Sequence, residues 1–597
     1  MTVKVEFEPL GRAGELTEPV TLLEIARALG IALLAPCGGQ GKCGRCVIQI
    51  TEGKFSPLTP ADYRFLSPEQ IAQGYRLACQ AKPLSHSRIF IPPESLSVPQ
   101  RLQIEGQEIP VEPEPGLRTY PLSLTPPSLQ DLRPDAERLI HALKSLYGIE
   151  ASLDFSLLRE LPEKLRAENW RGKAAVRQSE VVAFLPSEAF PLGLAVDLGT
   201  TKIATYLVNL ESGKTLAFRG LVNPQISYGE DIISRITYAS QKPGGASELQ
   251  KAVVEALNKA VAEMCADLKA HPSWVVEAVI VGNTAMHHLL LGLPVHQLGY
   301  APYVPAVQGA LEVKAREIGL ELAPGAVVYL PPLIAGFVGS DHVAALLAAG
   351  FGRSEGPALL LDIGTNTEIC LAFRGRLMSL SCASGPAFEG AHITCGMRAS
   401  PGAIESLTLE NDEVKFQTIE GLPPLGLCGS GILDVVAQLR KAGVIDPTGR
   451  MGPHPRVRRT NGQLSFVISE GSPEHPTILF TQKDVREIQL AKGAIRAGIE
   501  VLLRGANLSP EDLKEVILAG AFGTYLRTES AVEIGMLPRI PAERFRQIGN
   551  AAGAGARAML ISTSMRTDAE KLARRVEYIE LAAVPDFAEL FARAMLL

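Results

Sequence analysis

A short glycine-rich stretch near the start of the chain carries three of its nine cysteines. Residues 35–46 read APCGGQGKCGRC, so that Cys37, Cys43 and Cys46 follow the spacing C-x5-C-x2-C. A fourth cysteine, Cys79, lies 33 positions further along. Four thiolates in this arrangement are the ligand set of an iron–sulfur cluster. The pattern therefore predicts a domain in which one loop supplies three ligands and a separate segment supplies the fourth.

The residues between the cysteines suit such a loop. Glycine adopts backbone conformations that other residues avoid, and it leaves amide N–H groups free to face anionic sulfur atoms. A zinc site would favour two C-x2-C pairs, and this chain has one. A disulfide framework would fit a secreted chain, which nothing here indicates. We expect a cluster, with zinc or unligated core thiols as the alternatives. The loop glycines are Gly38, Gly39, Gly41 and Gly44.

With these motifs, the first part of the chain resembles the [2Fe–2S] ferredoxins of the β-grasp type. Its loop is one residue longer than the plant pattern C-x4-C-x2-C, and in this it is similar to the adrenodoxin-like branch. The resemblance implies that the four cysteines ligate a [2Fe–2S] cluster.

Length and charge favour a soluble multidomain protein. The 597 residues are enough for three or four domains with large cores. A net charge of −6 gives no reason to expect nucleic acid or an anionic membrane as a partner. The first residues lack the pattern of a signal peptide, and no stretch reaches the roughly 20 apolar residues of a membrane span. We expect a cytoplasmic protein, with the other five cysteines as reduced core thiols.

Composition divides the chain into four parts. We expect residues 1–93 to form the cluster domain, residues 94–125 a proline-rich linker, residues 126–190 a small αβ middle domain and residues 191–597 a large domain of two lobes. Alternating prolines make a stiff, extended spacer. Such a spacer would let a redox domain visit two places, and an arm packed on its neighbour is the alternative. The prolines of this stretch include Pro99, Pro110, Pro113, Pro115 and Pro121.

The large domain contains one pattern twice. At each place an apolar strand ends in aspartate, turns at Gly-Thr and returns as a second apolar strand. One copy would be weak evidence, but two copies in the same strand–turn–strand frame predict a duplicated fold. The first copy comprises Asp197, Gly199, Thr200, Thr201 and Lys202, and the second comprises Asp362, Gly364, Thr365, Asn366 and Thr367.

These turns suit the phosphates of a nucleotide. Glycine amides and threonine hydroxyls approach phosphate oxygens closely. Aspartates at strand ends hold Mg²⁺, mostly through water, because Mg²⁺ sheds its water shell reluctantly. The sequence GGQGKC lacks the leading glycine and the Ser/Thr of a P-loop. We therefore expect two facing hairpins that clamp ATP and Mg²⁺ between the lobes.

In these motifs the large domain resembles the superfamily of acetate and sugar kinases, heat-shock chaperones and actin. Asp341 lies near the expected cleft, where a carboxylate could orient a water molecule; the sequence assigns no other catalytic residue. The resemblance implies a contact with adenosine or ribose at Gly520, Ala521, Phe522 and Gly523.

The whole chain resembles the reductive activators of corrinoid-dependent methyltransferase systems, of the bacterial type. The expected fold is multidomain α/β and α+β: a β-grasp ferredoxin-like domain, a linker, a small middle domain and a duplicated actin-like (ribonuclease H-like) ATPase domain. The resemblance implies an ATP-hydrolysing enzyme that reduces an inactivated Co(II) corrinoid protein to Co(I), one electron passing through the cluster. It also implies a low-potential reductant or reductase as electron donor, and it is compatible with a homodimer.

Two other functions stay open. One is a redox-regulated kinase or chaperone-like ATPase in which the cluster acts as a sensor. The other is a simple electron carrier with a degenerate nucleotide fold, which the two intact aspartates and the two intact Gly-Thr turns disfavour. Turnover of a small alcohol or acid, without electron transfer to cobalt, would identify the first of these.

Overall fold

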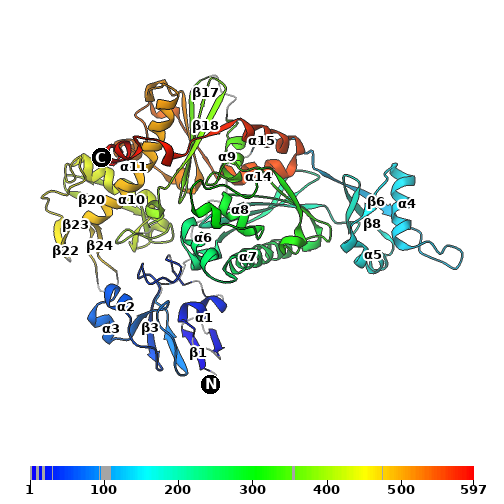
Figure 1. The fold of residues 1–597 in the computed structure, drawn as a ribbon, viewed down its shortest axis with the longest axis horizontal. Coiled ribbons are helices and arrows are strands. Elements are labelled where there is room, and N and C mark those ends of the chain that lie inside the picture. Colours follow the sequence, from blue (N-terminus) through cyan, green and yellow to red (C-terminus); the bar gives the residue numbers. More distant parts are fainter. Residues whose placement is uncertain are drawn as a thin grey trace.

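The structure is a computed structural model of the whole chain. It describes residues 3–8, 12–16, 20–29, 31, 33–35, 37–92, 95, 109–351, 356–390, 392–460, 462–472 and 475–597. A small N-terminal domain lies below a large two-lobed body, and a second small domain projects from one end of that body (Figure 1). The described part of the chain holds no helix that is both long enough and apolar enough to span a membrane.

The N-terminal domain is a five-stranded mixed sheet with the order β2-β1-β5-β3-β4. The pairing of β1 with β5 is parallel and the other pairings are antiparallel, which is the β-grasp arrangement expected from the cysteine loop. Helix α1 (Leu22–Ala28) begins at a capping box in which Thr21 and Glu24 satisfy each other's backbone N–H groups. The other elements are β1 (Val3–Glu8), β2 (Arg12–Leu16), β3 (Val47–Glu52), α2 (Pro60–Phe65), α3 (Pro68–Ala72), β4 (Tyr75–Leu77) and β5 (Ser87–Phe90).

The projecting domain has a four-stranded sheet with the order β6-β8-β9-β7, covered by two helices. Strand β6 (Leu117–Ser123) lies inside the stretch 94–125 that was expected to be a linker, and it pairs with β8 along its whole length. It is an edge strand, so Pro121 costs no ladder hydrogen bond on its open side. Residues 96–108 of the expected linker lie outside the described residues. The other elements are α4 (Asp135–Tyr147), β7 (Ser152–Leu153), α5 (Phe155–Ala167), β8 (Arg171–Arg177) and β9 (Glu180–Leu185).

The first lobe of the body is built on a six-stranded sheet with the order β12-β11-β10-β13-β15-β14. Its strands are β10 (Leu192–Leu198), β11 (Lys202–Asn209), β12 (Thr215–Val222), β13 (Val275–Gly282), β14 (Leu311–Lys314) and β15 (Val327–Leu330). Its α-helices are α6 (Ile232–Gln241), α7 (Gly245–Asp267), α8 (Thr284–Leu290) and α9 (Ser340–Ala348), and the 3₁₀ turn η2 (Pro224–Tyr228) precedes α6.

The second lobe repeats this plan, with the order β26-β25-β16-β17-β18-β27. In each lobe the first three strands form an antiparallel meander, and the first strand pairs in parallel with the fourth. The duplicated fold predicted from the two Asp-x-Gly-Thr motifs is therefore confirmed. The strands are β16 (Ala358–Ile363), β17 (Thr367–Phe373), β18 (Arg376–Cys382), β25 (Glu515–Ala519), β26 (Phe545–Gly549) and β27 (Val576–Tyr578).

Helices and two small sheets complete the second lobe. Three-stranded sheets with the orders β20-β19-β21 and β22-β23-β24 are inserted after β18. Their strands are β19 (Ala403–Glu410), β20 (Glu413–Thr418), β21 (Gly426–Leu427), β22 (Val457–Thr460), β23 (Gln463–Ser469) and β24 (Ile478–Thr481). The helices of this part of the chain are α10 (Gly429–Lys441), α11 (Gln482–Gly505), α12 (Gly520–Tyr525), α13 (Thr528–Glu533), α14 (Ala551–Ile561), α15 (Thr563–Arg575) and α16 (Phe587–Ala594). Of these, α14 packs against β10 and β13 of the first lobe.

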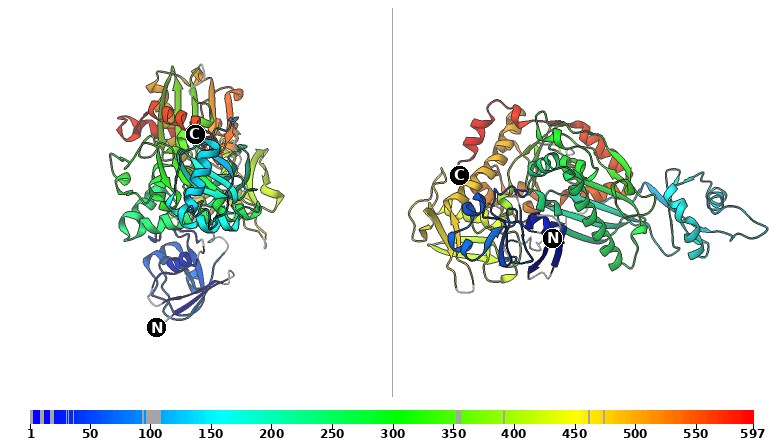
Figure 2. Two further views of the ribbon diagram at one scale, coloured as in Figure 1. Left: turned by 90° about the vertical axis from the view of Figure 1, so that its right-hand side faces the viewer. Right: turned by 60° about the horizontal axis from the view of Figure 1, so that its bottom comes forward.

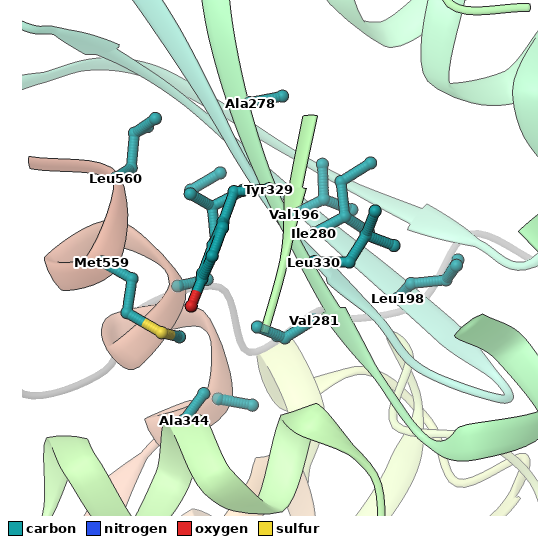
Figure 3. Packing of buried hydrophobic residues seen from close by; sticks show 14 of the residues in the cluster. Val196, Leu198, Ala278, Ile280, Val281, Tyr329, Leu330, Ala344, Met559 and Leu560 are labelled. Carbon is teal, nitrogen blue, oxygen red and sulfur yellow. The ribbon is translucent and has the colours of Figure 1, made fainter. Parts of the chain in front are cut away.

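A continuous apolar core joins the two lobes. Helices α9 and α14 lie against each other beside the first sheet, where Met559 and Leu560 face Tyr329 and the buried strands (Figure 3). The two helices are so close that a Cβ on Gly555 would stand 2.2 Å from the carbonyl oxygen of Ala344. A side chain larger than hydrogen is thus excluded at this crossing.

Candidate electron-transfer and nucleotide sites

The four predicted cluster ligands come together as two pairs. The Cys43 thiol donates to Cys37 Sγ at 3.3 Å, and the Cys46 thiol is hydrogen-bonded to Cys79. Cys46 and Cys79 are buried, whereas Cys37 and Cys43 are half-buried. The loop between α1 and β3 positions three of them, and the turn after β4 positions Cys79.

The loop backbone is shaped by glycines that other residues could not replace. Gly44 has a φ of +68°, and a Cβ there would lie 2.7 Å from the ring of Phe65. Gly38 has a φ of +64°. A side chain at either position would be strained by the left-handed backbone.

The surroundings favour the thiolate form at one sulfur of each pair, Cys37 and Cys79. Hydrogen bonding from Cys43 lowers the pKa of the Cys37 thiol to about 5, and hydrogen bonding from Cys46 lowers the pKa of Cys79 to about 7. The same bonds raise the pKa values of the two donor thiols. The Lys42 amide donates to Cys37 Sγ at 3.5 Å, and the Gln80 side chain donates to Cys79 Sγ at 3.4 Å. Donors of this kind stabilise the anionic sulfurs of a bound cluster.

The paired arrangement fits a two-iron cluster. Within the described residues, no three His, Cys, Asp or Glu side chains are grouped as ligands of one metal ion. A [2Fe–2S] cluster takes four cysteines in total, two for each iron. The pairs Cys37/Cys43 and Cys46/Cys79 supply that donor set, so the residues present fit the group.

The two Asp-x-Gly-Thr hairpins meet across the cleft between the lobes. The hydroxyls of Thr201 and Thr365 lie 3.0 Å apart, and Asn283 donates to Thr200 Oγ1 at 2.9 Å. One cavity is lined by nine of the ten predicted phosphate residues: Asp197, Gly199, Thr200, Thr201, Lys202, Asp362, Gly364, Thr365 and Asn366.

The tenth predicted residue, Thr367, lies behind the cavity wall. Its side chain is buried, and its hydroxyl is hydrogen-bonded to Ser384 at 2.9 Å. Of the predicted adenosine segment, Gly520 lines the cavity and Gly523 packs beside Leu518. The side chains of Ala521 and Phe522 lie outside the described residues.

Six carboxylates line this cavity, and burial perturbs four of them: Asp197, Asp341, Asp362 and Glu368. Burial raises the pKa of Asp197 to about 6, that of Asp341 to about 7 and that of Asp362 to about 8, and mutual repulsion adds to the last two shifts. The pKa of Glu368 is raised well above its ordinary value by the same causes. A bound divalent cation would offset this concentration of negative charge. Because no three such side chains in the described residues are grouped as direct ligands of one ion, these carboxylates fit a Mg²⁺ that is held mostly through its water shell.

Sequence reasoning missed Glu368. It lies directly opposite Asp362 in the ladder between β16 and β17. The sequence did contain a sign of it, because Glu368 is the one charged residue in the return strand TEICLAF. A charged side chain on a buried strand needs a partner or a ligand.

Further polar residues of the cavity also had no motif to reveal them. Thr365 Oγ1 donates to Glu389 Oε1 at 2.6 Å. Lys202 and Arg398 supply positive charge to the cavity, and burial lowers the pKa of Lys202. Glu389 and Arg398 belong to loops of the second lobe, whose approach to the first hairpin depends on tertiary structure alone.

The fold and the two sites define a class of protein: a ferredoxin-like electron carrier fused to a duplicated ATPase-type domain. Family descriptions match along nearly the whole chain: a 2Fe-2S iron-sulfur cluster binding domain at residues 7–84, the RACo linker region at 106–189, the RACo middle region at 192–354, and the C-terminal domain of RACo, the ASKHA domain, at 356–597. The middle region of that family is the first lobe described above.

Individual relatives match over most or all of the chain. The corrinoid activation enzyme RamQ of Eubacterium limosum is 32% identical over 610 residues, which cover 99% of this chain and 98% of that protein. The Co(II) methylated amine-specific corrinoid protein reductase of Methanosarcina barkeri is 28% identical over 415 residues, covering 64% of this chain and 72% of that protein. A solved structure of a reductive activator for corrinoid, iron-sulfur protein superposes with a TM-score of 0.72 at 34% identity, covering 100% of this chain and 98% of that one. The chain belongs to the same family as RamQ.

Proposed function

We propose that the protein reduces the inactive Co(II) form of a corrinoid protein to Co(I) in a reaction that consumes ATP. The observation that carries the proposal is that one chain, similar to RamQ from end to end, holds both a four-cysteine loop and a phosphate cavity. The names of the relatives support a corrinoid protein as the partner.

The cysteine loop would perform the redox part of the reaction. A bound [2Fe–2S] cluster supplies one-electron chemistry. Cys37, Cys43, Cys46 and Cys79 would hold it, while the Lys42 amide and the Gln80 side chain keep their hydrogen bonds to sulfur. Hydrogen bonds to the sulfurs are among the features that set the reduction potential of such a centre.

The cavity between the lobes would bind the phosphates of ATP together with Mg²⁺. Glycine amides and the hydroxyls of Thr200, Thr201 and Thr365 would contact phosphate oxygens, and the four carboxylates would hold the Mg²⁺ water shell. Asp341 lines the same cavity, where a carboxylate can orient a water molecule and accept its proton. We assign it the role of orienting the water that attacks the terminal phosphate.

The energetics explain why a nucleotide is needed. A plant-type [2Fe–2S] centre has a potential of about −400 mV, and Co(I) is the stronger reductant, so the transfer runs uphill. Each ~59 mV of mismatch costs a factor of ten in a one-electron equilibrium. A nucleotide shifts such an equilibrium only if it binds two states of the complex with different affinities. Closure of the lobes around ATP provides two such states.

The proposal extends to the electron donor and to the assembly. A low-potential reductant or reductase would reload the cluster between turnovers. A homodimer would cover exposed apolar side chains of the projecting domain, among them Leu129, which is 90% exposed, and Leu132, which is 77% exposed. Light scattering on the purified protein decides the oligomeric state.

Partner-stimulated hydrolysis tests the proposed function. Phosphate release from Mg-ATP is measured with the protein alone, with a Co(II) corrinoid protein, and with a panel of small alcohols and acids. We expect hydrolysis to be slow alone and to rise with the corrinoid protein. Stimulation by a small alcohol or acid, with transfer of phosphate to it and no response to any corrinoid protein, would identify a kinase instead.

A further inference from the structure

The ferredoxin-like domain contacts the first lobe at residues 223–231 and at Tyr238 of α6. We call residues 223–231, which include η2, the docking segment. Arg27, in the last turn of α1, donates to the carbonyl oxygen of Ser227. Its guanidinium carbon lies 4.5 Å from the ring centroid of Tyr228 and 5.7 Å from that of Tyr238. Figure 1 and the left view of Figure 2 show the N-terminal domain below the body.

The cluster loop itself touches the same segment. A Cβ on Gly38, the residue after Cys37, would lie 2.4 Å from the carbonyl oxygen of Tyr228. The two backbones are therefore packed with no room for a side chain between them. The face of the loop beside Cys37 is covered by the docking segment in this arrangement.

The docking segment is also tied to the first phosphate hairpin. Arg235 of α6 donates from Nε to the carbonyl oxygen of Gly229 at 2.8 Å and from its terminal nitrogens to Gln225 Oε1 at 3.2 Å and the carbonyl oxygen of Thr200 at 2.5 Å. Asn223 Nδ2 donates to the carbonyl oxygen of Gly199 at 2.8 Å.

Arg235 opposes separation of the two elements that it bridges, the docking segment and the first phosphate hairpin. Its side chain is fully buried, and burial lowers its pKa to about 9. A buried guanidinium that loses an acceptor leaves an N–H group unpaired, which is costly. Moving the docking segment away from the hairpin would break bonds at Gly229 or at Thr200, so the two are expected to move together.

We propose that Arg235 couples nucleotide binding at the phosphate cavity to docking of the cluster domain on residues 223–231. This inference rests on the nucleotide site proposed above, and it makes Arg235 a positioning residue for that site. The docked domain holds the hairpin in its present conformation, so that docking strengthens nucleotide binding. By linkage, a bound nucleotide strengthens docking, and its loss frees the cluster loop for a partner protein.

The first test measures nucleotide affinity in the full-length protein. The probe is a non-hydrolysable ATP analogue with Mg²⁺, titrated by calorimetry. Arg27→Ala removes the contact with Ser227 and Tyr228, and we expect it to weaken binding by about fivefold or more, the lower end of typical coupling. The matched control is Arg88→Ala, which removes exposed ion pairs with Glu6 and Glu8 inside the same domain and should change affinity less than twofold.

The outcomes separate the two hypotheses. If the unmodified protein binds the analogue and Arg27→Ala binds it equally well, the coupling is wrong while the nucleotide site stands. If the unmodified protein does not bind the analogue at all, the nucleotide site is wrong and the coupling falls with it.

A second test follows amide hydrogen exchange in residues 37–46. The analogue should slow their exchange in the unmodified protein, although they belong to another domain. Arg235→Lys keeps a positive charge but lacks the guanidinium fork. It should bind the analogue more weakly and, at saturation, show no slowing in residues 37–46. If Arg235→Lys does not fold, the same exchange measurement is made on Arg27→Ala, because Arg27 lies nearer the surface than Arg235. Unchanged exchange in the unmodified protein would overturn the proposal.

Discussion

The hydroxyls of Thr201 and Thr365, 164 positions apart in the chain, lie 3.0 Å from each other across the cleft. Each belongs to the Gly-Thr turn of its own lobe, and both line the cavity that the lobes enclose. The contact holds the two hairpins against each other in the cavity where we propose that the phosphates of ATP bind.

Removing one of these hydroxyls should weaken nucleotide binding. A hydrogen bond contributes about 0.5–1.5 kcal/mol, so Thr201→Val should raise the dissociation constant for Mg-ATP by about 2- to 10-fold in calorimetric titrations. Thr205→Val is the control. Thr205 lies on β11 outside the cavity lining, and the substitution removes its hydroxyl hydrogen bond to the carbonyl oxygen of Arg219. An equal effect of both variants would show that the loss acts through stability alone.

The carboxylate cluster predicts how stability depends on pH in the absence of metal. Asp341 and Asp362 have folded pKa values of about 7 and about 8, above their ordinary value of 3.8, because burial and mutual repulsion penalise the charged form. Their contribution to stability is complete below pH ~4 and is lost as the pH rises through 7 to 8. We expect the unfolding temperature in a chelator to fall by about 2 °C or more between pH 5 and pH 9.

Two additions sharpen this prediction. Asp362→Asn should reduce the fall of the unfolding temperature between pH 5 and pH 9. Asp586→Asn, which removes an exposed carboxylate paired with Arg504, should leave that fall unchanged. Saturating Mg²⁺ with ADP should also flatten it, because the bound cation stabilises the ionised carboxylates. A fall that persists unchanged in Asp362→Asn would contradict the assignment of these groups.

The cluster and the nucleotide should be separable by mutation. Cys43→Ala removes one of four thiolates, and we expect the visible absorbance and the electron paramagnetic resonance signal of the cluster to disappear. Mg-ATP should still bind, because no residue of the cavity changes. Asp362→Ala should do the reverse, keeping the cluster spectrum and abolishing the ATP-driven formation of Co(I). Loss of both properties in either variant would indicate a shared folding defect.

The left-handed glycines of the cluster loop should tolerate no side chain. Gly44→Ala places a Cβ 2.7 Å from the Phe65 ring in a backbone of positive φ, and backbone strain of this kind costs about 1–3 kcal/mol. We expect a lower cluster content and a lower melting temperature for the N-terminal domain. Gly309→Ala, where a Cβ meets no atom within 4 Å, should leave both unchanged.

Much of the fold followed from local patterns in the sequence. Two Asp-x-Gly-Thr turns were enough to predict a duplicated domain, because the motif fixes a strand, a turn and a strand in each copy. The limits of strand β6 were not predictable in the same way. Its composition, with Pro121 inside and further prolines before it, resembles a spacer, and only its place at the edge of a sheet makes proline acceptable.

The candidate site shows the same division between local and tertiary information. The phosphate residues lie on contiguous motifs and could be named from them. Asn283, Glu368 and Glu389 reach the cavity from separate elements, and their roles depend on which strands and loops meet there. Thr367 belongs to the motif but points behind the cavity wall, because alternate residues of a strand face opposite sides.

The most direct test of the central claim, that electron and nucleotide act in one reaction, is a spectroscopic single turnover. The protein is purified without oxygen, reduced, and mixed with a Co(II) corrinoid protein, and the visible spectrum is followed with and without Mg-ATP. We predict a Co(I) band that forms only with Mg-ATP, with the unmodified protein but with neither Cys43→Ala nor Asp362→Ala. A Co(I) band that forms equally well without ATP would contradict the account.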